Sequence, residues 1–264
     1  MTPLAVDLFC GLGGWTEGLM AEGYRVVGFD NERHVYGEAR YPAQLVIQDV
    51  LTIHGSQFKD AALIVASPPC QEYSYMAMPW SRAKAIAADY ESGARDRATL
   101  TALFDACFRI QREAIEAAGR YVPLVVENVC GAQRWVGRAR WHYGSFYLWG
   151  DVPALMPVTK RAKVGGMSWS DFGKPDYKPL AFNGEADKRL REVGAKGVGG
   201  WFGNYQEQKA RTDGVKQGGD WFNDSQPSIS RQCSSKSKAR KAASAHIAKI
   251  PYELARHIAR AWLP

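Results

Sequence analysis

The sequence has 264 residues, 46% of them hydrophobic and 12% aromatic, which is enough apolar material for one large folded domain or two. No apolar run reaches the roughly 18 residues of a membrane-spanning helix, and five widely spaced cysteines without a CxxC pair argue against a disulfide scaffold or a zinc site. The net charge of +7 is uneven, because residues 151–264 carry 20 Lys and Arg against 11 Asp and Glu, whereas residues 1–150 carry 14 against 16. The basic second half predicts a polyanionic partner, or else only a solvated basic surface.

Short apolar runs alternate with helical patterns through the first 150 residues. Strands are expected at residues 3–9, 24–30, 43–50, 61–70, 121–129 and 144–150, and helices at 15–23, 34–42 and 97–118. This alternation predicts an α/β fold with a doubly wound, mostly parallel sheet. Ligands of such sheets bind beyond the carboxyl ends of the strands. The unusual residues fall at those ends: Asp7, Asp30, Asp49, Cys70 and Glu127.

Residues 158–235 have a different composition, rich in Gly, Lys, Trp, Ser and Asn, and their periodicity is weak. They predict a small, loop-rich basic domain or a large insertion. The chain then returns to a helical pattern that is interrupted at Pro251.

A glycine-rich turn, "DLFCGLGG" at residues 7–14, follows the first expected strand and precedes a helix. Its glycines let the backbone approach a ligand, and a helix N-terminus favours an anionic group. Such a loop fits NAD, FAD or S-adenosylmethionine, and is often only a tight turn. Asp30 is placed to hold a ribose diol and Asp49 to accept from an adenine amino group, although each acid could instead cap the next helix.

The stretch "VASPPCQEYSY" at residues 65–75 presents Cys70 behind two prolines at the end of an apolar run. A thiolate in such a place is a candidate nucleophile, whereas a lone buried cysteine is usually inert packing. Glu127 ends the strand "VVENV", where a shielded carboxyl group could exchange a proton or pair with an arginine.

These stretches together resemble one family. "DLFCGLGG", "SPPCQEYS" and "ENV", in this order, look like motifs I, IV and VI of the cytosine carbon-5 DNA methyltransferases. "IQDV" and "DRATL" are similar to motifs III and V, and "AHIAKIPYELARHIA" to a divergent motif X. The resemblance covers residues 1–150 and about 243–261. It implies the Rossmann-like fold of methyltransferases that use S-adenosylmethionine, and a compact member of prophage or solitary type.

The resemblance also implies a role for each matching residue. Cys70 attacks carbon 6 of a flipped-out cytosine, Glu127 holds its ring nitrogen 3 and amino group, and Asn128 organises the loop around Cys70. In place of motif VIII the chain offers "VGRARW", so Arg140 is expected to contact the target base or its phosphate. No metal is required. The residues implied for the cofactor site are Asp7, Phe9, Gly11, Gly13, Gly14, Asp30, Asn31, Asp49, Val50, Pro69 and Leu100.

Three segments follow from this resemblance. Residues 1–157 are expected to form the catalytic and cofactor-binding domain, 158–235 a target-recognition domain, and 236–264 a segment that returns to the first domain. Trp169, Trp201 and Trp221 are then recognition aromatics or a small core.

The expected partner is duplex DNA, with no membrane and no obligate protein partner, in the cytoplasm of a bacterium or of a phage host. RNA (tRNA) cytosine methylation and a catalytically inactive DNA-binding relative are the alternatives.

Overall fold

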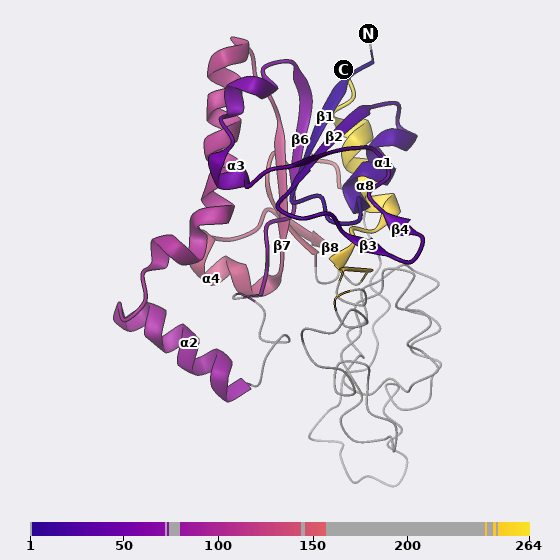
Figure 1. The fold of residues 1–264 in the computed structure, drawn as a ribbon. Coiled ribbons are helices and arrows are strands. Elements are labelled where there is room, and N and C mark those ends of the chain that lie inside the picture. The colour runs from indigo at the N-terminus through magenta and orange to yellow at the C-terminus, as the bar shows by residue number, and fades with distance from the viewer. Residues whose placement is uncertain are drawn as a thin grey trace, which may run out of the picture. The chain divides into compact units, whose positions relative to one another are not determined.

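The computed structural model describes residues 2–71, 73, 80–143, 146–156, 241, 245–246 and 248–264 (Figure 1). The chain divides into two units, and the first comprises Met1–His142, Phe146–Met156 and Ile250–Pro264. The expected target-recognition segment at 158–235, with its three tryptophans, lies outside the described residues.

A seven-stranded sheet forms the centre of this first unit, in the order β5-β2-β1-β6-β7-β9-β8. Its strands are β1 (Leu4–Leu8), β2 (Arg25–Asp30), β5 (Gln44–Ile47), β6 (Ala61–Ala66), β7 (Leu124–Asn128), β8 (Trp141–Tyr143) and β9 (Phe146–Gly150). The five strands from β5 to β7 pair in parallel, and β9 pairs antiparallel to β7. The predicted α/β fold with a mostly parallel, Rossmann-like sheet is therefore confirmed.

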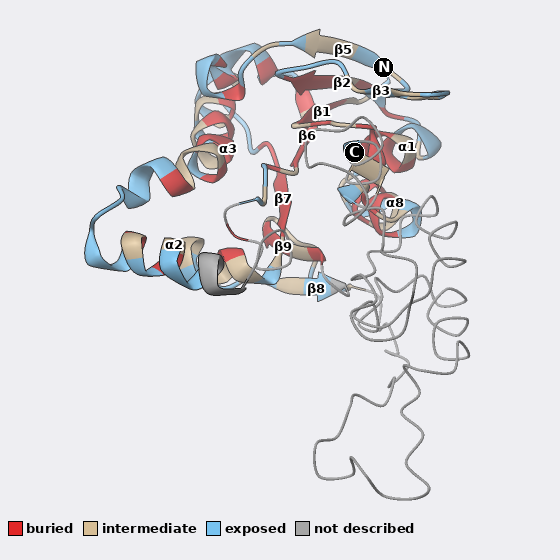
Figure 2. Cartoon of the chain, turned by 60° about the horizontal axis from the view of Figure 1, so that its bottom comes forward, coloured by how far each residue is buried: buried red, intermediate tan, exposed pale blue. Residues whose placement is uncertain are grey.

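Helices cover both faces of this sheet (Figures 1 and 2). α3 (Arg97–Ala118) lies on one face, and α1 (Gly14–Ala21) and α8 (Tyr252–Ala261) lie on the other. Two further helices, α2 (Trp80–Ser92) and α4 (Gln133–Val136), lie beside the lower end of α3. Short 3-10 helices occupy Val50–Thr52, Gly55–Phe58 and Cys130–Ala132.

Local sequence explains why α3 has the bounds that its pattern predicts. Asp96 caps its start by accepting a hydrogen bond from the Ala98 N–H at 2.9 Å, and Gly119 ends it in the left-handed region at φ 63°. Between these ends, buried side chains recur every three or four residues: Leu100, Phe104, Cys107, Ile110 and Ala114. This stripe packs on the sheet, so the buried side chains of α3 and of the strands form one hydrophobic core.

The prediction of a helix at residues 34–42 is wrong. The chain there forms a hairpin of β3 (Val35–Tyr36) and β4 (Ala39–Arg40), with Gly37 at φ 63° in the turn. A left-handed glycine breaks a helix but suits a two-residue hairpin turn. The helix α2 and the strand β8 were not predicted.

The C-terminal helix α8 packs against α1. Arg256 and Arg260 both pair with Glu22 at the end of α1, at 2.6 and 2.8 Å between Nε and the carboxylate oxygens. Tyr24 donates a hydrogen bond from its hydroxyl to the Ala259 carbonyl at 3.1 Å. Residues more than 230 positions apart in the sequence are therefore in direct contact where α8 packs against α1.

Candidate functional site

The glycine loop, the Cys70 loop and Glu127 lie at the carboxyl ends of three neighbouring strands, β1, β6 and β7. From β1 the chain runs to β2 on one side, whereas β6 and β7 lie on the other, so the order of strands reverses between β1 and β6. At this reversal the end of β1 is in register with the end of β6, Leu8 opposite Ala66, and Ala66 lies opposite Val126 of β7. Such a switch point is where open α/β sheets bind ligands.

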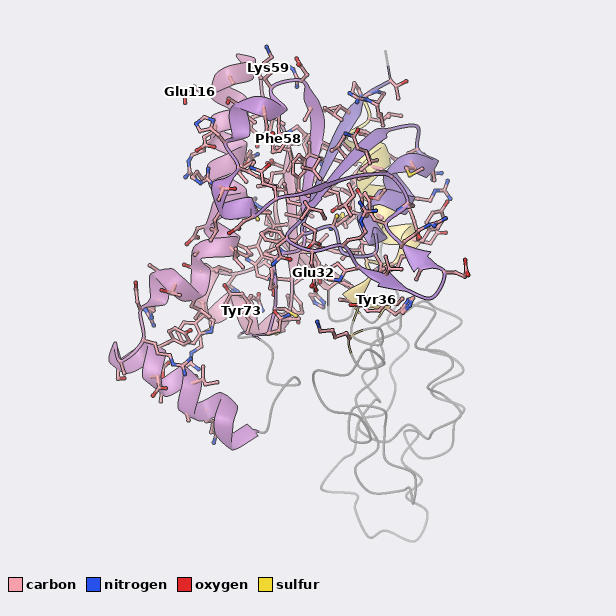
Figure 3. All side chains as sticks on the ribbon, viewed as in Figure 1. Glu32, Tyr36, Phe58, Lys59, Tyr73 and Glu116 are labelled. Carbon is pink, nitrogen blue, oxygen red and sulfur yellow. The ribbon has the colours of Figure 1, made fainter. Side chains whose placement is uncertain are left out.

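Figure 3 distinguishes the two ends of the sheet. Glu32, Tyr36 and Tyr73 lie at the carboxyl end of the parallel strands, and Phe58, Lys59 and Glu116 lie at the opposite end. The loops that follow β1, β6 and β7 therefore converge on the edge marked by Tyr73.

The loop after β1 has an unusual backbone. Phe9 has φ 57°, a left-handed conformation that costs an aromatic residue about 1 kcal/mol or more. Hydrogen bonds hold it there, because the Cys10 N–H donates to the Phe29 carbonyl at 3.1 Å and the Gly13 N–H to the Cys10 carbonyl at 2.8 Å. Gly13, at φ 79°, precedes α1, and no described side chain caps the first turn of that helix. Backbone N–H groups at this turn are thus available to an anionic ligand.

Asp30, at the end of β2, is tied to this loop. Its Oδ2 accepts a hydrogen bond from the Gly11 N–H at 2.9 Å, and His34 Nε2 lies 3.5 Å from Oδ1. Burial is the largest influence on its pKa and raises it, but the interactions with His34 and the Gly11 N–H outweigh burial, and the pKa lies below its usual value. Asp30 therefore stays ionised beside the glycine loop.

The other acids predicted for the cofactor site have different surroundings. Asp49 is exposed, and its Oδ1 accepts the Leu51 N–H at 2.9 Å, so it caps a 3-10 helix. Asp7 is only 1% exposed and lies under the loop, where its Oδ2 accepts the Thr16 hydroxyl at 2.6 Å. Its Oδ1 has no hydrogen-bond partner among the described residues, and burial raises the pKa of Asp7 to about 7.

Cys70 lies in a partly exposed loop that is fastened at two points to neighbouring segments. Ser67 accepts a hydrogen bond from Trp15 Nε1 at 3.0 Å, which joins this loop to the start of α1. The Pro68 carbonyl accepts from Asn128 Nδ2 at 3.0 Å, which joins it to the end of β7. The chain just before Cys70 therefore has little freedom.

The chain after Cys70 is fastened as well. The Tyr73 N–H donates to the Cys70 carbonyl at 3.1 Å, and the Tyr73 hydroxyl donates to the Leu100 carbonyl of α3 at 2.7 Å. Sequence reasoning missed both Tyr73 and Trp15, although Tyr73 lies within the motif "SPPCQEYS" and Trp15 directly follows "DLFCGLGG". Their polar atoms find partners 27 and 52 residues away, which no local pattern encodes.

The described cysteines differ in their surroundings. Burial raises the pKa of the thiols of Cys10 and Cys107 above its usual value, so both stay neutral. Cys130 is exposed, three residues after Glu127. Cys70 is partly exposed, in a loop at the carboxyl edge of the sheet.

The remaining predicted residues spread over several elements. Glu127 and Asn128 are 6% and 1% exposed, and their strand β7 pairs with β9. Leu100 is buried in α3 and Val50 in the 3-10 helix, whereas Asn31 and Pro69 are exposed. Arg140 is exposed, and its backbone N–H donates to the Leu148 carbonyl of β9 at 2.9 Å. Burial raises the pKa of Tyr121, which precedes β7, and the positive charge of Arg140 acts to lower it. Gly14 begins α1.

Two general features of the described chain bear on its chemistry. None of the helices that the structure describes is both long and apolar enough to span a bilayer. Within the same residues, no group of three or more His, Cys, Asp and Glu side chains is arranged to bind a metal ion.

Comparison with known proteins gives one family match, which covers only part of the chain. Residues 4–83, which include the glycine loop and Cys70, match the C-5 cytosine-specific DNA methylases, and the resemblance seen in the motifs is confirmed over this segment. No curated protein matches the chain.

Several solved structures are similar to part of the chain. A protein assigned as a DNA modification methyltransferase encoded within an E. coli prophage is 18% identical (TM-score 0.31), over 51% of this chain and 35% of that one. The S. pombe Dnmt2 methyltransferase is 15% identical (TM-score 0.31), over 51% and 37%. The Entamoeba histolytica methyltransferase EhMeth is 14% identical (TM-score 0.31), over 52% and 41%. The matched part therefore spans between 35% and 41% of the length of these proteins.

Proposed function

We propose that this protein is a DNA methyltransferase that transfers a methyl group from S-adenosylmethionine to carbon 5 of cytosine in duplex DNA, with Cys70 as nucleophile. The observation that carries the proposal is the pair of loops at the switch point. The glycine loop after β1 and the Cys70 loop after β6 lie on adjacent strands and are joined by the hydrogen bond from Trp15 to Ser67. A cofactor bound at the first loop is thereby brought to the nucleophile on the second.

The residues at the first loop suit S-adenosylmethionine. Asp30 is ionised beside the loop and can accept from ribose hydroxyls, and the uncapped first turn of α1 can receive the carboxylate of the methionine part. Phe9 and Leu100 supply apolar surface, whereas Asp7 supports the loop from beneath rather than reaching the ligand. The bound cofactor supplies an electrophilic methyl group on a sulfonium.

The reaction needs a nucleophile because carbon 5 of cytosine is itself a weak one. The Cys70 thiolate forms a bond to carbon 6, which moves an electron pair toward carbon 5. Carbon 5 then takes the methyl group, and loss of its proton returns the electron pair that expels the thiolate. The target base has to leave the duplex stack to reach Cys70.

Two residues at the end of β7 support this step. Glu127 can hydrogen-bond ring nitrogen 3 and the exocyclic amino group, which stabilises the charge that develops when Cys70 adds. Asn128 holds the Pro68 carbonyl and so positions the loop that presents Cys70. The basic segment at 158–235 and Arg140 are proposed to contact the DNA.

The test is a measurement of 5-methylcytosine in DNA from cells that express the full chain, after digestion to nucleosides and mass spectrometry. The matched pair of variants is Cys70→Ser and Cys130→Ser, because both thiols follow the ends of neighbouring strands. Wild type and Cys130→Ser should produce 5-methylcytosine, and Cys70→Ser should produce none.

A parallel measurement on tRNA addresses the other nucleic acid. Methylcytosine in tRNA alone would replace duplex DNA with RNA as the substrate. Methylation that persists in Cys70→Ser would remove Cys70 from the mechanism. Soluble, folded protein that methylates neither nucleic acid would contradict the proposed reaction.

A further inference from the structure

The helices α2 and α4 lie beside the lower end of α3 (Figure 1). Arginines of this region form a cluster that the proposed reaction does not use. We call it the arginine cluster and define it as Arg95, Arg97 and Arg134 with the rings of Tyr90 and Trp135. The guanidinium carbons of Arg97 and Arg134 lie 5.3 and 5.2 Å from the centre of the Trp135 ring. Arg95 lies 5.6 Å from the Tyr90 ring, and the two rings pack edge to face at 5.8 Å.

The charge of this region differs from that of its surroundings. Residues 84–97 and 133–138 carry five Lys and Arg against three Asp and Glu. The remaining residues of 1–150 carry nine Lys and Arg against thirteen Asp and Glu. A local positive surface on an otherwise acidic half of the chain is the electrostatic mark of a polyanion contact.

Arg97 is the arginine of the cluster whose charge is most accessible to a phosphate group. Arg95 lies 3.5 Å from Asp89, and Arg134 pairs with Glu91, so each has a carboxylate neighbour. Arg97 is exposed at the first turn of α3, and no carboxylate among the described residues lies within ion-pair distance of it. A guanidinium that lies over an indole ring is preorganised and weakly hydrated, which suits contact with phosphate.

The cluster is joined to the Cys70 loop through α3. Arg97 is one helical turn before Leu100, whose carbonyl accepts the Tyr73 hydroxyl, and the Tyr73 N–H donates to the Cys70 carbonyl. Each strand of a duplex carries a phosphate about every 3.4 Å along its axis. A duplex with a cytosine at Cys70 therefore carries further phosphates on either side of the target, and the two hydrogen bonds of Tyr73 keep the Cys70 loop close to the first turn of α3.

We propose that the arginine cluster binds the sugar–phosphate backbone of the substrate duplex beside the target cytosine, without reading its sequence. This inference rests on the proposed function. Tyr90 is 5% exposed and Trp135 is partly buried beside two guanidiniums, so the cluster presents charge rather than an open ring for base stacking. Contacts of this kind position a protein on DNA, whereas base contacts elsewhere specify the site.

The test compares Arg97→Gln and Arg97→Lys with Arg112→Gln in the full chain. Arg112 is an exposed arginine of the same helix, about 22 Å along the axis from Arg97 at about 1.5 Å per residue. Binding is measured by fluorescence anisotropy on two short duplexes of unrelated sequence and on tRNA, over a range of salt concentrations. Thermal midpoints of the three variants confirm that each is folded.

The expected result follows from counterion release. Loss of one phosphate contact lowers the slope of log affinity against log salt by about 0.9, which corresponds to about fivefold weaker binding near 0.15 M salt. Arg97→Gln should show this change equally on both duplexes, and Arg112→Gln should bind like wild type. Arg97→Lys keeps the charge but loses the planar, bidentate guanidinium, so it should recover the slope and only part of the affinity.

Other outcomes overturn the inference. An Arg97→Gln variant that matches Arg112→Gln in slope and affinity shows that the cluster does not contact phosphate. Weakening on one duplex alone means base recognition, and weakening on tRNA alone means an RNA contact. Failure of the proposed reaction is a separate result, since wild type that binds duplex without forming 5-methylcytosine contradicts the chemistry and not the salt slope.

Discussion

Asp7 should make the stability of this protein fall as pH rises. Burial, the largest cause, raises its pKa from 3.8 to about 7 against the opposing hydrogen bond from Thr16, and the nearby charge of Asp30 raises it further. The folded state therefore holds this proton more tightly than the unfolded state does. Below about pH 4, ionisation of Asp7 does not affect the free energy of unfolding. As pH rises toward about 7, Asp7 lowers this free energy increasingly, and above about pH 7 the full reduction remains.

The magnitude follows from the size of the shift. One pKa unit corresponds to about 1.4 kcal/mol, so a shift of about three units destabilises the folded state by about 4 kcal/mol at alkaline pH. Asp7→Asn keeps the shape of the side chain and cannot ionise. Relative to wild type, its free energy of unfolding should improve by about 4 kcal/mol between about pH 4 and about pH 8.

The assay is urea unfolding followed by tryptophan fluorescence at a series of pH values, because Trp15 is buried near Asp7's partner Thr16. Burying the Asn amide in Asp7→Asn changes the free energy of unfolding by the same amount at every pH. That contribution cancels, since only the change with pH is compared. The other ionisable groups are common to both proteins and cancel as well. A difference between variant and wild type that stays flat across this range would refute the reasoning.

Two further substitutions test the contacts that hold the unit together. A Cβ added at Gly18 would come within 2.4 Å of the Ala255 Cβ and 2.6 Å of the Arg256 nitrogen, so Gly18→Ala should push α8 from α1 and lower the free energy of unfolding by about 1–3 kcal/mol, as read from the urea midpoint. An unchanged midpoint would mean that the two helices do not pack this closely. Asn128→Ala leaves the buried Pro68 carbonyl without its donor, at a cost of about 1–3 kcal/mol, and should slow methyl transfer while cofactor affinity is kept. A full transfer rate in this variant would show that the hydrogen bond does not position Cys70.

Much of this fold is encoded in short-range patterns. The apolar runs of β1, β2, β5, β6, β7 and β9 were recognisable as strands, and α3 begins and ends where an aspartate and a glycine mark its limits. The same patterns placed Cys70, Asp30 and Glu127 at strand ends, because parallel strands joined by crossovers share one carboxyl edge. The hairpin at β3 and β4 was misjudged, since glycine at a positive φ is indistinguishable in sequence from glycine in a helix.

Residue types, spacing and turn chemistry by themselves determined the α/β class and the edge of the sheet at which the candidate residues lie, and they led to the proposal of Cys70 as nucleophile. Only the tertiary structure decided which groups touch: Asn128 with Pro68, Trp15 with Ser67, and α8 with α1. It also showed that Asp7 lies under the glycine loop and Asp30 beside it, although both acids end strands. Period and turn signals are local properties of the chain, whereas hydrogen bonds between residues 52 to 235 positions apart depend on the order of strands and on which helix faces pack together.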